Sequence, residues 1–268
     1  MPLIDAHCHV SPLWFEPVET LLFQMERNGV EKAVLTQILG QFDNSYQRDC
    51  VTHYPDRFVS IGAVNAAEEG AADQVATLAA DGMAGLRLRP DARSPGDDPL
   101  AVWRAAASSG LVISCGGASE QLLAPEFAEL VDTFPDVPFV VEHLGGWTRP
   151  DCDKSAETWN GILGLARFPN ISIKIPALGQ IISRGVGKPL PAAGPVLDPS
   201  GASVLTEALA AFGPERLMWG SDFPVVSSRE GYANALAWTR QIFEGYGPAV
   251  VDAIFGMNAQ RIFFQRKA

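Results

Sequence analysis

The sequence predicts a single-domain α/β protein folded as a (β/α)8 TIM-type barrel over residues 1–268. Eight short apolar runs alternate with longer amphipathic segments along the whole chain, which is the pattern of parallel strands joined by helices. The length is that of one barrel domain. Hydrophobic residues make up 47% of the chain and charged residues 19%, so a sizeable core can form.

The eight apolar runs are rich in β-branched residues, as expected of strands buried on both faces of a parallel sheet. In chain order they cover residues 3–9, 33–38, 58–65, 85–89, 111–115, 139–143, 171–175 and 217–221. Helical spacing of apolar residues is clearest in segments 17–28, 66–80, 100–109, 125–134 and 203–212. Glycines follow several helical segments, as at helix C-termini: Gly29, Gly82, Gly110 and Gly213.

Two features bear on alternatives to a regular barrel. A doubly wound open sheet is the structural alternative, and it is disfavoured because no GxGxxG follows the first strand. Residues 176–199 interrupt the regular pattern, since they are rich in Gly and Pro and carry Arg184 and Lys188. A segment of this kind after a late strand is typical of a functional loop or lid.

Charge and cysteine content restrict the partners. The formal net charge is −11, which disfavours nucleic acid and anionic membrane surfaces but is compatible with a small anionic substrate in a locally positive pocket. The N-terminus lacks a signal-peptide pattern, and no apolar run reaches transmembrane length. The four cysteines form no CxxC pair, so we expect reduced thiols and a cytoplasmic location. Exterior helix faces could also pair in a homo-oligomer.

Histidines and one aspartate gather at predicted strand ends. Asp5, His7 and His9 alternate on the first strand, which predicts that all three share one face. His143 ends the sixth strand and Asp222 the eighth. In a closed barrel the first and eighth strands are neighbours, so we expect Asp222 beside His7 and His9 at the C-terminal mouth. Two imidazoles and a carboxylate suit zinc or a similar divalent ion; hydrogen-bonded structural histidines are the competing interpretation.

The fourth histidine, His53, ends a helical stretch and is interpreted as structural. Charged residues also lie within predicted strands. Arg87 and Arg89 alternate on the fourth strand, and an inward pair would offer bidentate donors to a substrate carboxylate. Salt bridges to Glu142 or Asp5 are the competing use. Lys174, on the seventh strand, is predicted either to contact substrate or to form an ion pair with a helix.

The sequence resembles the amidohydrolase superfamily, and within it the amidohydrolase-related branch of lactonases and non-oxidative decarboxylases. The resemblance rests on Asp5-x-His7-x-His9 and on segments 140–145 (VVEHLG), 219–224 (WGSDFP), 54–58 (YPDRF), 85–87 (GLR) and 258–259 (NA). It implies a (β/α)8 barrel with His7 and His9 as metal ligands where metal is present. It also implies that Asp222 is a ligand or general base, that His143 lies by the attacking water or the substrate carbonyl, and that Arg87 is favoured for substrate.

The chain departs from this pattern at the fifth strand. Metal-dependent relatives commonly carry a histidine there, whereas this sequence has Ser114, Cys115 and Gly116. Either Cys115 is a thiolate ligand, or His7, His9 and Asp222 hold the metal alone, or no metal binds, as in some lactonases of this branch. We expect Cys115 to line the substrate pocket rather than bind metal.

Together these residues predict hydrolysis of a lactone, one carrying a carboxylate, by direct attack of water. Asp222 would accept the water's proton, and zinc or a similar ion would activate the water and the carbonyl. Without metal, the histidines would polarise the carbonyl through hydrogen bonds. No GxSxG elbow supports a covalent serine mechanism. The alternatives are metal-dependent decarboxylation of a small aromatic or dienoic acid, and a non-catalytic barrel that binds a small acid.

Overall fold

The computed structural model describes residues 1–181 and 202–265. Its centre is one eight-stranded sheet in the order β1 to β8, with every neighbouring pair parallel. The strands are β1 Ile4–Cys8, β2 Lys32–Thr36, β3 Phe58–Ala63, β4 Gly85–Leu88, β5 Val112–Cys115, β6 Phe139–Val141, β7 Ile171–Ile175 and β8 Leu217–Trp219. All eight predicted strands are confirmed, with ends that differ by at most two residues.

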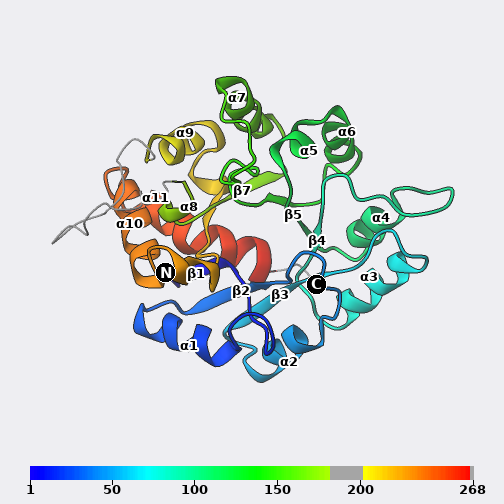
Figure 1. Ribbon diagram of the computed structural model, residues 1–268, viewed down its shortest axis with the longest axis horizontal. Coiled ribbons are helices and arrows are strands. Elements are labelled where there is room, and N and C mark those ends of the chain that lie inside the picture. Colours follow the sequence, from blue (N-terminus) through cyan, green and yellow to red (C-terminus); the bar gives the residue numbers. More distant parts are fainter. Residues whose placement is uncertain (182–201, 266–268) are drawn as a thin grey trace.

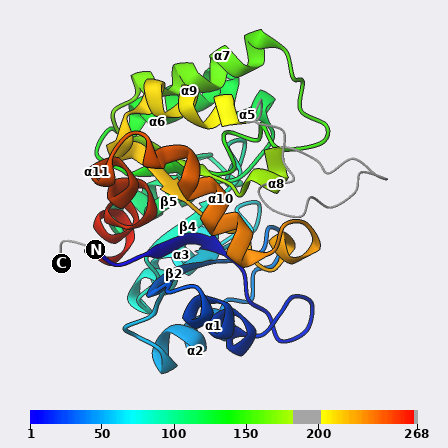
Figure 2. The same cartoon turned by 90° about the vertical axis from the view of Figure 1, so that its left-hand side faces the viewer.

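Helices surround this sheet (Figures 1 and 2). They are α1 Val18–Arg27, α2 Ser45–His53, α3 Ala71–Ala80, α4 Ala101–Ser108, α5 Ser119–Leu123, α6 Pro125–Thr133, α7 Ala156–Gly164, α8 Leu178–Ile181, α9 Ala202–Phe212, α10 Tyr232–Glu244 and α11 Pro248–Asp252. None of the described helices is long and apolar enough to cross a membrane. The predicted loop or lid spans residues 176–199. Its first part contains α8, and residues 182–199 lie outside the described residues.

The barrel closes where β1 meets the segment after β8. Cys8 forms an isolated parallel bridge with Phe223. The backbone N–H of His9 donates to the Phe223 carbonyl at 2.7 Å, and the N–H of Asp222 donates to the His7 carbonyl at 2.9 Å. This junction, called the seam below, therefore brings the first strand against the chain after the eighth, as predicted for a closed barrel.

The core has two apolar layers. The larger one lies between the strands and the helices, where Phe139 of β6 packs against the rings of Trp103 and Phe127. The smaller one fills the barrel interior with strand residues such as Val112 and Val140, together with Phe263 from the C-terminal helical segment. Two residues after Val112 and Val140 come the polar residues Ser114 and Glu142, whose side chains are hydrogen-bonded to each other.

Candidate active site

A register shift on β1 decides which of its side chains enter the barrel. Asp5 pairs with Ala33 and Cys8 pairs with Leu35, so β1 advances three positions while β2 advances two. One extra residue in a strand is a β-bulge, which re-aims the side chains on either side of it. From Asp5 onward, the side chains of β1 therefore do not alternate strictly between the two faces of the sheet.

Asp5 is turned away from the histidines as a result. Its carboxylate accepts hydrogen bonds from the Ser221 hydroxyl at 2.6 Å and from the hydroxyl of Tyr232, on α10, at 2.9 Å. It also accepts the backbone N–H groups of Ser221 and His7. The prediction that Asp5 shares a face with His7 and His9 is wrong. Asp5 instead ties β1 to the segment after β8 and to α10.

The remaining predicted cluster is present at the C-terminal mouth. The Nε2 atoms of His7 and His9 lie 3.9 Å and 3.4 Å from Oδ1 of Asp222. The ring centroid of His7 is 4.8 Å from that of His9 and 4.6 Å from that of His143. His7, His9 and Asp222 are buried and His143 is half-buried. The seam thus places Asp222 beside His7 of β1 and beside His9, which directly follows β1, as predicted.

The backbone is strained at this cluster. Among the described residues, left-handed φ values outside glycine occur at His143 (48°), Leu144 (52°) and Asp222 (58°). Such conformations cost free energy and concentrate at functional sites, where the surrounding structure imposes them. Two of the three residues carry the side chains that the sequence assigned to catalysis.

Gly220 allows the close approach of β8 to β1. A Cβ atom at this position would lie 2.5 Å from the Cβ of His7, closer than two carbon atoms can pack. Only glycine therefore fits between Trp219 and Ser221 without displacing His7.

The imidazoles of His7 and His9 have different partners at Nδ1. In His9, Nδ1 donates to the Thr36 carbonyl at 2.6 Å. In His7, Nδ1 faces the Nζ atom of Lys174 at 3.1 Å. Lys174 also donates to the Ser114 hydroxyl at 3.5 Å. Lys174 therefore contacts the histidine cluster from within the barrel, and no helix carboxylate among the described residues forms an ion pair with it.

Burial and charge set the protonation of the cluster. Burial, followed by the charge of Lys174, lowers the pKa of His7 well below its usual value, so this ring is neutral at pH 7. Burial lowers the pKa of Lys174 to about 8, although Glu142 opposes the shift. Burial raises the pKa of Asp222, but His143, His9 and Arg229 outweigh it, so the net pKa is lowered. Asp222 is an anion at neutral pH.

Arg87 adopts the competing structural role. Its guanidinium contacts the Glu142 carboxylate through Nη2 at 2.6 Å and Nε at 3.0 Å, and its Nη1 donates to the Gln37 carbonyl at 2.7 Å. The side chains of Arg87 and Glu142 are 6% and 1% exposed. Burial raises the pKa of Glu142, but the charges of Arg87 and Lys174 outweigh it and hold the pKa at about 2. The pair is a buried, fully charged salt bridge.

Arg89 does not join Arg87 inside the barrel. β4 ends at Leu88, so Arg89 follows the strand, and its side chain is 58% exposed beside Asp91 at 3.4 Å. The predicted inward pair of arginines is therefore wrong. Because β4 ends one residue before Arg89, the strand geometry that would turn Arg89 to the same face as Arg87 does not extend to it.

Cys115 is likewise placed differently from the expectation. Ser114 points into the barrel and donates to Glu142 at 2.7 Å. The next residue on the strand points the other way, and Cys115 is fully buried in the apolar layer between strands and helices. Burial raises the pKa of its thiol. Cys115 neither lines the pocket nor groups with potential metal ligands among the described residues.

Two neighbours of Asp222 were missed by sequence reasoning. Gln180 of α8 donates through Nε2 to Oδ2 of Asp222, and its Oε1 accepts from Nδ1 of His143 at 3.1 Å. Nη2 of Arg229 lies 3.7 Å from Oδ2 of Asp222. Neither residue belongs to a motif or a strand, so no periodic signal marks it. The WGSDFP segment could at most have directed attention to the loop that carries Arg229.

The donor set fits a divalent ion. His7, His9 and Asp222 each offer one ligand atom within 4.8 Å of the others. Because Nδ1 of His9 donates to a carbonyl, the lone pair of neutral His9 lies on Nε2, facing a carboxylate oxygen. Two acceptors that face each other need a proton or a cation between them. Nε2 of His7 is buried without a hydrogen-bond partner in the structure, which leaves it available to a ligand.

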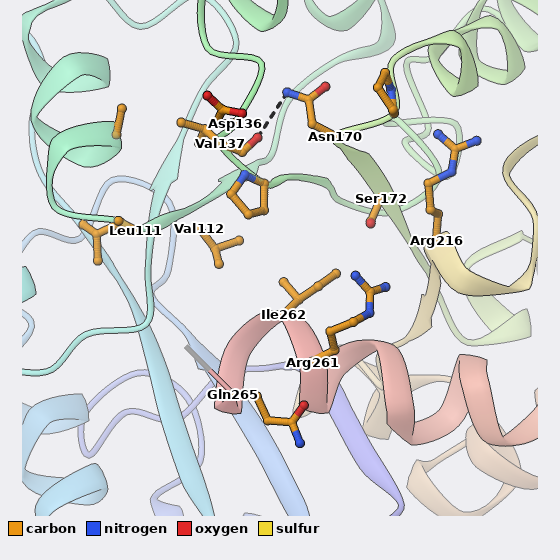
Figure 3. A pocket seen from close by; sticks show the side chains of 14 residues that line it. Leu111, Val112, Asp136, Val137, Asn170, Ser172, Arg216, Arg261, Ile262 and Gln265 are labelled. Carbon is orange, nitrogen blue, oxygen red and sulfur yellow. Dashed lines mark hydrogen bonds between the residues drawn. The ribbon is translucent and has the colours of Figure 1, made fainter. Parts of the chain in front are cut away.

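A cavity of about 580 Å³ opens at the C-terminal ends of β2, β3 and β4, and none of His7, His9, His143 and Asp222 lines it. It is lined by the segments after β2, β3 and β4, with Arg87 on the barrel side and with Arg89 and Arg93 further out. A second cavity, of about 480 Å³, lies at the opposite end of the strands, where Ser172 and Arg261 face it (Figure 3). Arg87 of the first cavity binds Glu142, whose carboxylate lies within 4.8 Å of ring nitrogens of His7 and His143, so the first cavity is the candidate substrate cavity.

Fold and site together define a (β/α)8-barrel protein with a histidine–aspartate centre at the C-terminal mouth. The family model described as "Amidohydrolase" matches residues 4–265. The chain therefore belongs to the amidohydrolase family, as the sequence motifs predicted. The family typically binds a divalent metal.

Several individual proteins are similar to this chain. The chain is 26% identical to an L-fucono-1,5-lactonase of Burkholderia ambifaria over 88% of this chain and 80% of that protein. It spans 42% of the length of another curated relative, an uncharacterized protein of Sinorhizobium fredii. Among solved structures, a zinc-bound amidohydrolase from Burkholderia multivorans has a TM-score of 0.80 at 20% identity, with 98% of this chain and 99% of that chain covered. A putative 2-pyrone-4,6-dicarboxylic acid hydrolase from Pseudomonas putida has a TM-score of 0.75 at 19% identity over 99% of each chain.

Proposed function

We propose that this protein hydrolyses a small lactone that carries an anionic group. The observation that carries the proposal is the Asp222 carboxylate, charged at neutral pH and held among three histidines at the barrel mouth. The four cysteines are buried and the sequence contains no GxSxG motif, so a water nucleophile suits the site better than a covalent one. The lactonase among the curated relatives supports the substrate class.

In the proposed reaction, Asp222 accepts a proton as water attacks the lactone carbonyl. The acyl–oxygen bond of the ring then breaks, and the same proton passes to the leaving alkoxide, which gives a hydroxy acid. Gln180 contacts both Asp222 and His143 and so would hold the base relative to the histidine. A divalent ion such as zinc, held by His7, His9 and Asp222, would polarise the carbonyl and acidify the water. The zinc-bound relative supports this cofactor.

We assign the anionic part of the substrate to the cavity at the mouth. All three guanidinium nitrogens of Arg87 already donate within the protein, so its positive charge is neutralised by Glu142. Arg89 and Arg93 line the same cavity further out, and Arg89 is exposed. We therefore assign the substrate carboxylate to Arg89 and Arg93, with Arg87 positioning the wall of the site.

The test is Asp222→Asn assayed on a panel of lactones with and without a carboxylate. We expect kcat to fall by about a hundredfold or more, since the amide cannot accept the proton but keeps the shape of the side chain. Asp151→Asn, at an exposed aspartate, is the matched control and should retain full activity. Turnover of Asp222→Asn near the wild-type rate would exclude Asp222 as the base. Release of carbon dioxide from aromatic acids would instead identify a decarboxylase, and binding without turnover a non-catalytic barrel.

A further inference from the structure

The second cavity, at the N-terminal ends of the strands, is positively charged. Its volume is about 480 Å³, which is within the range of small-molecule sites. The charged residues that line it are Arg216, Arg261 and Asp136, and Asp136 lies on the opposite side of the cavity from both arginines (Figure 3). In a chain of formal net charge −11, two guanidinium groups against one carboxylate make this cavity a place where an anion is attracted.

Neither arginine is neutralised by an ion pair with the described residues. Arg216 donates only to backbone carbonyls, at 2.9 to 3.0 Å. Arg261 donates through Nη2 to the Glu215 carbonyl at 2.7 Å and to the amide oxygen of Asn258 at 3.4 Å. Carbonyl and amide oxygens carry no net charge, so both guanidinium groups keep their positive charge. Nε and Nη1 of Arg261 remain available as donors.

A serine hydroxyl faces the same cavity from the barrel interior. Ser172 of β7 pairs in register with Val140 of β6, which belongs to the apolar layer of the interior. Six other strands each place an apolar residue in that layer: Ile4, Val34, Ile61, Val112, Val140 and Met218. Ser172 is 7% exposed, and its hydroxyl makes no hydrogen bond within residues 1–181 and 202–265. A buried hydroxyl without a partner costs free energy, which a bound acceptor would remove.

The shape of the cavity combines polar and apolar contacts. The Ser172 hydroxyl and the Arg261 guanidinium point toward each other across open space, with Val112 and Ile262 beside them (Figure 3). A carboxylate between the two polar groups would accept from the hydroxyl with one oxygen and from the guanidinium with the other. The rest of an organic acid would lie against Val112, Pro138 and Ile262. An inorganic anion would leave this apolar wall without a partner.

The walls of the cavity are held in place by the protein itself. Asn170 donates to the carbonyls of Phe134 and Val137, both at 3.1 Å, and so fixes the chain before β7 to the chain before β6 (Figure 3). Arg216 holds segment 166–168 through its carbonyls. A cavity fixed in this way is ordered before a ligand arrives, which lowers the cost of binding.

We propose that this cavity is a second binding site, for a small organic carboxylate. Ser172 and Arg261 bind the carboxylate group, Arg216 adds positive charge, and the apolar wall contacts the carbon skeleton of the acid. The proposal goes beyond the proposed function, because no residue of the histidine–aspartate centre lines this cavity.

The test is carbon-13 methyl NMR of the full-length protein with labelled isoleucine, titrated with benzoate. The methyl groups of Ile262 report on this cavity, and Ile262→Leu assigns their signals. We expect a saturable shift of the Ile262 signal with benzoate and none with benzamide, a neutral molecule of the same shape. Because only Ile262 is read, benzoate bound at the mouth does not affect the result. No lactone is used, so the outcome is independent of the lactonase proposal.

Two variants test the contacts. Arg261→Gln and Ser172→Ala should each lower the benzoate affinity measured at Ile262 by about tenfold or more, the scale of one hydrogen bond to a charged group. Arg149→Gln, at an exposed arginine, is the matched control and should bind as the wild type does. Unchanged signals of the other isoleucines show that each variant is folded.

Three outcomes would refute the inference. The first is the lack of a saturable Ile262 shift with benzoate in the wild type. The second is wild-type affinity in both folded variants. The third is binding of inorganic phosphate, followed at Ile262, as tight as that of benzoate, which would show that the apolar wall does not contribute.

Discussion

Replacing Arg87 by Met should destabilise the protein strongly. The change removes the guanidinium that contacts both oxygens of Glu142 and the Gln37 carbonyl, in a place where Arg87 is 6% exposed. Glu142 would keep one hydrogen bond, from Ser114. Removing one partner of a buried ion pair costs about 3–5 kcal/mol because the other charge is left uncompensated. We expect a loss within this range, since only the charge of Lys174 remains nearby to offset it.

Urea denaturation of a double-mutant cycle measures this value. With an m-value of about 3 kcal/mol/M, a loss of about 4 kcal/mol lowers the midpoint by more than 1 M. Arg87→Met combined with Glu142→Leu should be more stable than Arg87→Met alone, because the unpaired charge is gone. In folded Arg87→Met, turnover of charged and neutral lactones should fall by similar factors. A single variant within about 1 kcal/mol of wild type, or a loss confined to KM of charged substrates, would refute the structural role of Arg87.

Three further outcomes are expected. Gly220→Ala should lower kcat by about a hundredfold, the cost of moving a catalytic group by about 1 Å, because the new Cβ displaces His7; an unchanged kcat would show that β1 yields without loss. Cys115→Ser should cost about 1–3 kcal/mol on thermal unfolding, since the hydroxyl enters an apolar layer, and a change in KM would contradict this placement. Glu142 has a folded pKa of about 2, below its unfolded value, so its contribution is fully present above pH 4.5 and is lost as pH falls toward 2. Acid titration should show a loss of about 3 kcal/mol, which Glu142→Gln abolishes.

The sequence predicted the fold because apolar strand patterns repeat eight times along the chain and glycine follows several of the helices, and both signals act locally. It also predicted that His7, His9 and Asp222 meet, because strand order alone makes the first and eighth strands neighbours in a barrel. Its errors concern side-chain direction. A one-residue bulge turned Asp5 outward, and a strand that ends at Leu88 released Arg89 to solvent.

These errors have one physical origin. Along a strand a shift of one position moves a side chain to the other face, and the energies that decide such a shift come from partners that are distant in the chain. Ser221 and Tyr232, which hold Asp5, are examples. Cys115 was misassigned for the same reason, since its neighbour Ser114 is the residue that faces Glu142. Motif position therefore predicted the neighbourhood of each residue better than its orientation.

The seam has a consequence for the way this site comes into being. Asp5 and Ser221 are 216 positions apart in sequence, yet their contact and the Cys8–Phe223 bridge bring the proposed base to its histidines. In any state where the barrel is open at the seam, His7 and His9 therefore lack Asp222, even if every helix and the other strand pairs have formed. Opening the seam would separate Asp222 from His7 and His9 and would therefore abolish the proposed reaction, even with the rest of the barrel intact.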